Sequence, residues 1–119
     1  MFASLSGSGN GFDGKPALGV LIDGKWPQAN VFSSVALTIN KWQFVAFTLK
    51  GNVGSVFIDG VLTGQAYISI PRNVVRDTNY VGRSQSSNDQ YLYASVDDLR
   101  IFRRALPADE QMTLSTHSI

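Results

Sequence analysis

The sequence contains no cysteine, a single histidine and few charged residues. The absence of cysteine excludes disulfides, thiolate metal ligands and a thiol nucleophile. Charged residues make up 16% of the chain and the formal net charge is +1, so no strong field attracts nucleic acid or an anionic membrane. No apolar run approaches the roughly 20 residues that cross a bilayer. We therefore expect neither nucleic-acid binding nor insertion into a membrane.

What the sequence does contain is enough apolar material for one hydrophobic core. Hydrophobic residues make up 44% of the 119 residues, and this length fits a single domain. Residues 1–15 are rich in glycine and serine, which predicts a flexible lead or a long loop. We expect residues 16–119 to form the folded domain.

Short runs of β-branched and aromatic residues alternate with turn signals along most of the chain. This pattern predicts strands at 17–22, 35–39, 42–49, 53–58, 61–70, 79–82 and 91–102. Asp59-Gly60 favours a type I′ hairpin, because both central residues of that turn need a positive φ. Gly64 marks a bulge in the strand that follows.

The run at 42–49 is the most apolar in the sequence. Its apolar side chains occur at both odd and even positions, which predicts a central strand covered on both faces and not an edge strand. Trp42 opens this run, so we expect its ring in the core. Truncation by Trp42→Ala should then cost about 3–5 kcal/mol, as for other large core aromatics.

The C-terminal residues change character. Pro107 suits the first turn of a helix, and Asp109 and Glu110 fall where the helix dipole favours acidic groups, so a short helix is predicted at 107–115. Many short strands followed by one helix predict an antiparallel β-sandwich.

Four sequence blocks occur in a fixed order, and a tail at 104–110 follows them. They read Lys-Trp-Gln-Phe-Val-Ala-Phe-Thr at 41–48, Val-Phe-Ile-Asp-Gly at 56–60, Tyr-Val-Gly-Arg at 80–83 and Val-Asp-Asp-Leu-Arg-Ile-Phe at 96–102. This order resembles the laminin-G-like and pentraxin-like branch of the concanavalin A-like superfamily. The resemblance implies an all-β fold, an antiparallel jelly-roll β-sandwich with one short C-terminal helix.

Two departures from this family pattern affect what is expected of the chain. Family members begin with Trp-containing strands that have no counterpart upstream of Ala17, so the resemblance implies a domain that is incomplete at its N-terminus. Gln111 stands where the family places an apolar residue, which is expected to weaken the docking of the last helix.

Catalysis finds little support among the polar residues. The single His117 lies near the C-terminus, where a side chain is usually solvated. Asp97 and Asp98 are adjacent on a predicted strand and therefore point to opposite faces, so they cannot flank one glycosidic bond. We expect no enzymatic activity.

Two loops combine an aromatic ring with amide or carboxylate groups, as a sugar site requires. The candidate ligand-binding residues are Trp26 and Asn30 in the first loop, and Asn88, Asp89 and Tyr91 in the second. Two structural alternatives stay open, since the first ring can instead anchor its loop on the sandwich and the second loop can be a solvated turn.

The resemblance also implies a role for Asp97, either as a ligand of a structural calcium ion or as a hydrogen-bonding residue that holds the preceding loop. No other cofactor is expected. The chain is thus predicted to be a non-catalytic, lectin-like module that binds a glycan or a protein surface, outside the cell or at its surface. The alternative is an assembly domain whose unpaired strand edges form a homo-oligomer or pair with another chain.

Overall fold

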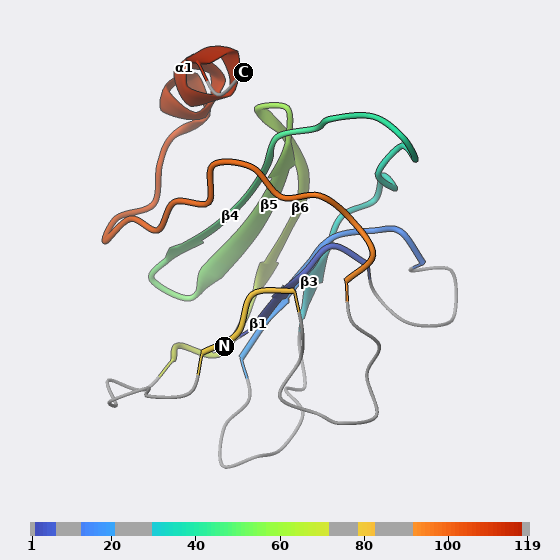
Figure 1. The fold of residues 1–119 in the computed structure, drawn as a ribbon. Coiled ribbons are helices and arrows are strands. Elements are labelled where there is room, and N and C mark those ends of the chain that lie inside the picture. The colour runs from blue at the N-terminus through green and yellow to red at the C-terminus, as the bar shows by residue number, and fades with distance from the viewer. Residues whose placement is uncertain (1, 7–12, 21–29, 72–78, 83–91, 118–119) are drawn as a thin grey trace.

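The computed structural model describes residues 2–6, 13–20, 30–71, 79–82 and 92–117 (Figure 1). Within them the chain forms two antiparallel three-stranded sheets and one helix. The first sheet has the order β1-β2-β3 and contains β1 (Phe2–Ser4), β2 (Ala17–Gly19) and β3 (Val31–Phe32). The second has the order β4-β5-β6 and contains β4 (Val45–Lys50), β5 (Val53–Ile58) and β6 (Val61–Tyr67). The helix is α1 (Ala108–His117). This arrangement confirms the predicted all-β sandwich with one C-terminal helix.

Strand β1 lies within the residues that were predicted to form a flexible lead. Phe2 pairs with Gly19 and Ser4 pairs with Ala17, so this part of the lead is built into the first sheet. Local composition could not reveal this pairing, because the partner strand lies beyond the glycine-rich segment. The division of the chain at residues 15 and 16 stays a prediction.

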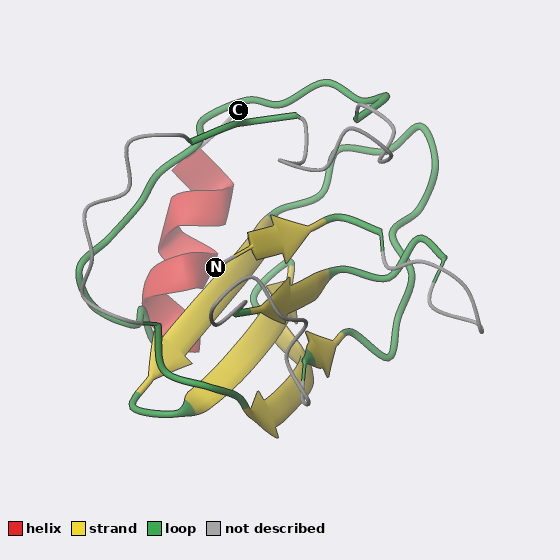
Figure 2. Cartoon of the chain, turned by 90° about the horizontal axis from the view of Figure 1, so that it is seen from below, coloured by secondary structure: helices red, strands yellow, loops and turns green. Residues whose placement is uncertain are grey.

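The core lies between the two sheets, which Figure 2 shows from below. Its buried side chains are each at most 4% exposed and come from both layers and from the residues that directly follow β2 and β6: Leu18, Val20, Val31, Val56 and Ile68. The half-buried side chains of Phe47, Leu49 and Ala66 pack against this cluster from the second sheet. Alternate residues of β4 to β6 therefore face the core, and the others face away from it.

The turn between β5 and β6 confirms the predicted hairpin. Asp59 has a φ of 51° and Gly60 a φ of 80°, the two positive values that a type I′ turn needs. The Asp59 carboxylate also accepts a hydrogen bond from the backbone N–H of Phe44 (2.9 Å), which ties this turn to the start of β4. The register shifts between Val56 and Phe57, opposite Gly64, as predicted for a bulge.

The two sheets meet at one corner, where β6 lies beside the end of β3. The backbone N–H of Ser34 donates to the carbonyl of Thr63 (2.9 Å), and the Ser33 and Thr63 hydroxyls are 2.9 Å apart. Gly64 is next to this junction, and a Cβ there would overlap the carbonyl oxygen of Phe32. The backbone approach at this corner therefore requires glycine.

Three predicted strands differ from the structure. Residues 35–39 and 79–82 form no strand, and the described residues of the third, 92–102, also run without strand pairing. Each has a suitable apolar pattern, but a strand needs a neighbour in the fold as well as a pattern. The local sequence alone therefore does not predict strand formation in these three segments.

Two expectations for the 42–49 run are wrong. In the described part of the chain β4 has β5 as its only neighbour, so it is an edge strand. Trp42 is 61% exposed, because the strand begins only at Val45 and the chain has not yet joined the sheet at residue 42.

Helix α1 begins at Ala108, one residue later than predicted, and lies beside the β5–β6 turn (Figure 1). Gln111 is fully buried, and its side-chain N–H donates to the carbonyl of Leu106 (2.9 Å). Its Oε1 accepts no hydrogen bond from the described residues, so the polar group does carry a cost there. The described part of the chain holds no helix long and apolar enough to span a membrane.

Candidate functional site

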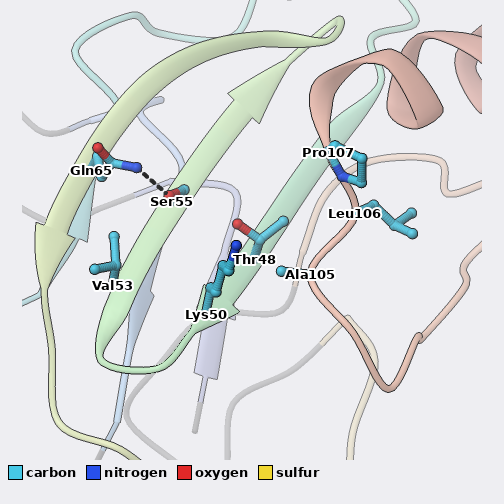
Figure 3. A pocket seen from close by; sticks show the side chains of 8 residues that line it. All are labelled: Thr48, Lys50, Val53, Ser55, Gln65, Ala105, Leu106 and Pro107. Atoms are coloured by element: carbon cyan, nitrogen blue, oxygen red, sulfur yellow. Dashed lines mark hydrogen bonds between the residues drawn. The ribbon is translucent and has the colours of Figure 1, made fainter.

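A hollow of about 420 Å³ lies on the face of the second sheet that points away from the core (Figure 3). Its floor is made of side chains from β4, β5 and β6, and its wall is the chain that leads into α1. The lining residues are Thr48, Lys50, Val53, Ser55 and Gln65 on the floor, and Ala105, Leu106 and Pro107 on the wall.

A straight row of polar side chains crosses the floor. Thr48 is paired with Ser55, and Ser55 is paired with Gln65, so the three side chains project from one face at neighbouring positions. The Gln65 amide N–H donates to the Ser55 hydroxyl (3.0 Å), which fixes the amide in the row. Ser55 is only 4% exposed, whereas Gln65 is exposed at the rim. The row thus offers one hydroxyl at depth and an oriented amide above it.

The adjacent row adds a charge and an aromatic ring. Lys50 is paired with Val53, and Val53 is paired with Tyr67 on β6. Tyr67 is 72% exposed, so its ring is available to a ligand at the edge of the hollow. Lys50 is the only charged side chain that lines the hollow in the described part of the chain.

The wall is held in place by contacts with α1. The hydrogen bond from Gln111 to the Leu106 carbonyl ties the wall to the buried side of the helix. On the outer side, Arg104 forms an ion pair with Glu110 (2.6 Å). The hydrogen bond and the charge of Glu110 raise the pKa of the Arg104 guanidinium above its ordinary value. The helix therefore positions the residues that close one side of the hollow.

The chemistry of this surface suits binding. Hydroxyl, amide and ammonium groups can donate to or accept from the hydroxyl groups of a ligand, and the Tyr67 ring can cover an apolar face. The lining residues carry no carboxylate. In the described ranges no three His, Cys, Asp or Glu side chains gather in a group that could hold a metal ion.

The residues predicted for ligand binding are only partly described. Trp26, Asn88, Asp89 and Tyr91 lie outside the described residues. Asn30 is half-buried just before β3, its Oδ1 accepts no hydrogen bond from the described residues, and it does not line the hollow.

The sheet-face residues were missed because aromatic rings were sought in loops. The signal that would have found them is the hairpin register set by the two-residue turns together with the bulge near Gly64, which brings Gln65 opposite Ser55 and places Thr48, Ser55 and Gln65 on one face.

Asp97 is exposed, and the described residues bring no two further acidic or imidazole side chains to it. Calcium takes six to eight oxygen ligands, so these residues alone do not form a complete calcium site. The role of Asp97 as a ligand stays a prediction.

The fold defines a class of protein, the concanavalin A-like β-sandwiches. A sequence model described as the concanavalin A-like lectin/glucanases superfamily, of the laminin-G type, matches residues 6–110. The chain belongs to this family. Members of the laminin-G type are, in general, binding modules and not enzymes.

One solved structure supports the same conclusion. It is the crystal structure of an S-layer domain-containing protein (residues 221–444) from Clostridium thermocellum ATCC 27405, with 34% sequence identity and a TM-score of 0.62. The match covers 87% of this chain and 52% of that one, so the chain spans about half the length of the S-layer protein fragment. Comparison with the curated proteins gives no significant match.

Proposed function

We propose that the chain is a non-catalytic recognition module that binds carbohydrate on the open face of the β4–β6 sheet. The observation that carries this proposal is the row of Thr48, Ser55 and Gln65 across the floor of the hollow, next to the exposed ring of Tyr67. A sugar presents hydroxyl groups on its edges and C–H groups on its faces. The polar row matches the first and the aromatic ring matches the second.

The predicted loop residues extend this proposal. Trp26, Asn30, Asn88, Asp89 and Tyr91 would supply a second contact region at the loops that join the strands, where binding sites on rigid scaffolds often lie. The partner would then be a glycan chain, or a protein surface that carries one, in contact with both regions. Membership of a superfamily that contains lectins supports a carbohydrate ligand.

The proposed location is outside the cell or at its surface. The support is the likeness, at 34% identity, to an S-layer domain-containing protein. The same likeness favours a second candidate function, a structural domain that assembles with other chains at a surface. The exposed apolar side chains of residues 92–102 favour that second function as well.

The carbohydrate proposal is tested by screening the chain against a glycan array and then measuring the affinity of the best ligand by calorimetry. Gln65→Ala should weaken binding about 3- to 10-fold, because one hydrogen bond contributes about 0.5–1.5 kcal/mol. Tyr67→Ala should weaken it by a similar or larger factor, since the stacking surface is lost.

Trp42→Ala is the matched control. Trp42 is an aromatic residue of similar exposure, 61% against 72% for Tyr67, and it precedes β4, so it lies outside the paired strand rows that carry the proposed site. Its truncation should leave the affinity unchanged. If Trp26→Ala or Tyr91→Ala abolishes binding while both sheet-face variants bind normally, the site lies on the loops. If no glycan binds at all, the lectin-like function is wrong.

Calcium at Asp97 is a separate proposal with its own measurement. The melting temperature is compared with calcium and with EDTA, for the parent chain and for Asp97→Asn. A calcium ligand predicts that EDTA lowers the melting temperature of the parent only. Equal melting of the parent in both conditions would leave hydrogen bonding as the role of Asp97.

A further inference from the structure

We propose that residues 98–103 of one copy of the chain add as an antiparallel strand to the outer edge of β4 in a second copy, and that the exchange is reciprocal. This inference deepens the assembly role proposed above and does not depend on carbohydrate binding. It rests on two elements that complement each other, occur in the same chain and have no strand partner on the relevant side among the described residues.

The first element is the outer edge of β4. In the described part of the chain this strand pairs with β5 alone, so its other side presents unpaired backbone N–H and C=O groups. On its core face β4 carries the apolar side chains of Val45, Phe47 and Leu49. Phe47 and Leu49, which pack against the core, are only half-buried at this edge. A neighbouring strand would cover both side chains and satisfy the backbone.

The second element is the segment at 93–105. No backbone hydrogen bond joins these residues to any other described residue, although folded proteins form about one hydrogen bond per residue. Figure 1 draws the segment as a plain orange trace without an arrow. Leu99 is 61% exposed, Ile101 91% and Phe102 46%. Such a run of β-forming residues, without backbone partners among the residues that the structure describes, is available to join a sheet.

Asp98 marks the point where this segment departs from an extended conformation. Its φ is 57°, a left-handed value that is unfavourable for most residues with a side chain, and its carboxylate is paired with Arg100 (2.7 Å). Pairing with β4 would return Asp98 to the extended region and offer it Lys50 as a new partner.

The side chains define one register for this pairing. In an antiparallel arrangement that places Leu99 opposite Leu49, Ile101 falls opposite Phe47, so the apolar side chains continue the core face of the sheet. Asp98 then falls opposite Lys50 on the other face, and the charges are opposite. A shift by one residue would put Asp98 and Arg100 on the core face instead. That register is disfavoured because it would bury two charged side chains against the core.

The position of Ala105 indicates a second copy and not the chain's own β4. In this register Arg103 lies opposite Val45, at the start of the strand. Ala105 lines the hollow together with Thr48 and Lys50, at the other end of β4. Thr48 is about 10 Å along the strand from Val45, whereas two residues reach about 7 Å. Pairing within one chain would therefore draw Ala105 toward the start of β4 and away from Lys50, whereas pairing between two chains places no such constraint on it.

The first experiment uses the absence of cysteine in the natural sequence. Chains carrying Lys50→Cys are mixed with chains carrying Asp98→Cys and oxidised gently. The two sulfurs come from directly opposed positions, so a mixed disulfide between unlike chains should be the main product. Lys50→Cys mixed with Arg103→Cys is the control, because these positions lie at opposite ends of the paired strands. Its yield should be at least tenfold lower.

The second experiment measures the mass in solution by light scattering coupled to size exclusion. The parent chain should give a dimer that dissociates on dilution. Ile101→Asp should shift the dissociation constant upward by at least tenfold, because it places a charge in the new core contact. Its matched control is Tyr93→Asp, which alters a fully exposed residue outside the paired segment and should leave the dimer intact. Because Ile101 is itself 91% exposed in the single chain, the dilute monomer should melt as the parent does.

The outcomes separate the alternatives. A parent chain that stays monomeric at all concentrations overturns the exchange and any self-assembly, and leaves carbohydrate binding to its own test. A dimer without the mixed disulfide overturns this pairing and retains assembly by another surface. If a chain carrying both Lys50→Cys and Asp98→Cys closes an internal disulfide and stays monomeric, the segment pairs with its own β4 and the exchange is wrong.

Discussion

Substitution of Gly64 by alanine should separate the two sheets at the corner where they meet. The new Cβ would overlap the carbonyl oxygen of Phe32 and would lie 2.9 Å from its carbonyl carbon and 3.3 Å from the Cα of Ser33. All three obstacles are backbone atoms, so no side chain can rotate away. The strands must move apart instead, and the hydrogen bond from Ser34 to Thr63 lengthens or breaks.

The magnitude follows from three contributions. Overpacking of a filled site costs about 1–3 kcal/mol, and the loss of one hydrogen bond costs about 1 kcal/mol. Replacing glycine by alanine also reduces the entropy of the unfolded chain, which offsets about 0.4–1 kcal/mol of this loss of stability. We therefore expect Gly64→Ala to lower the free energy of unfolding by about 2–3 kcal/mol.

Urea denaturation followed by circular dichroism measures this change. With a slope of about 1–3 kcal/mol per molar urea, the midpoint should fall by about 1 M or more. Tyr67→Ala is the control on the same strand, since its exposed side chain should contribute little to stability. A Gly64→Ala chain that unfolds at the parent's midpoint would refute the close approach of Gly64 and Phe32.

Three further substitutions test the fold. Trp42→Ala should change the free energy of unfolding by less than about 1 kcal/mol, in contrast to the cost of a core residue, as thermal melting will show. Gln111→Leu removes a buried Oε1 that has no described partner and also removes one hydrogen bond, so the protein should keep its stability or gain up to about 1 kcal/mol. Gln111→Ala leaves a cavity and should lower the melting temperature. Asp59→Ala loses the acceptor for Phe44 and forces alanine to a φ of 51°, so urea titration should show a loss of about 2–3 kcal/mol, and Asp59→Asn should retain most of the stability.

Local signals predicted the central hairpin well. The Asp59-Gly60 turn and the bulge near Gly64 depend on conformational preferences of single residues, and both occur in the structure. The sandwich fold was predicted from the short strands separated by turn signals and was also implied by the family resemblance of the sequence blocks. By contrast, the edge position of β4 and the exposure of Trp42 depend on which strands meet in space. An apolar pattern predicts that a strand favours burial. It does not predict which neighbouring strand, if any, covers it in the fold.

The candidate site shows the same division. No single residue of the floor is distinctive, because Thr48, Ser55 and Gln65 are common residues in any sheet. They form a binding surface only because the strand register places them side by side. The wall of the hollow depends in turn on the hydrogen bond from Gln111 to the Leu106 carbonyl. Sequence reasoning favoured loop aromatics such as Trp26 since a ring next to an amide can be recognised without knowledge of the fold.

The corner between β3 and β6 has a consequence for the size of any assembly. Because Ser34 and Thr63 join the layers, the six described strands behave as one ribbon folded over on itself, with β1 at one end and β4 at the other. A growing polymer needs two adhesive ends on each building block. Strand β1 spans only three residues, too short to template a further strand, whereas β4 spans six. β4 is therefore the one described edge that can accept a strand, and the reciprocal exchange uses this edge and the 98–103 segment of both chains, so growth stops at the pair.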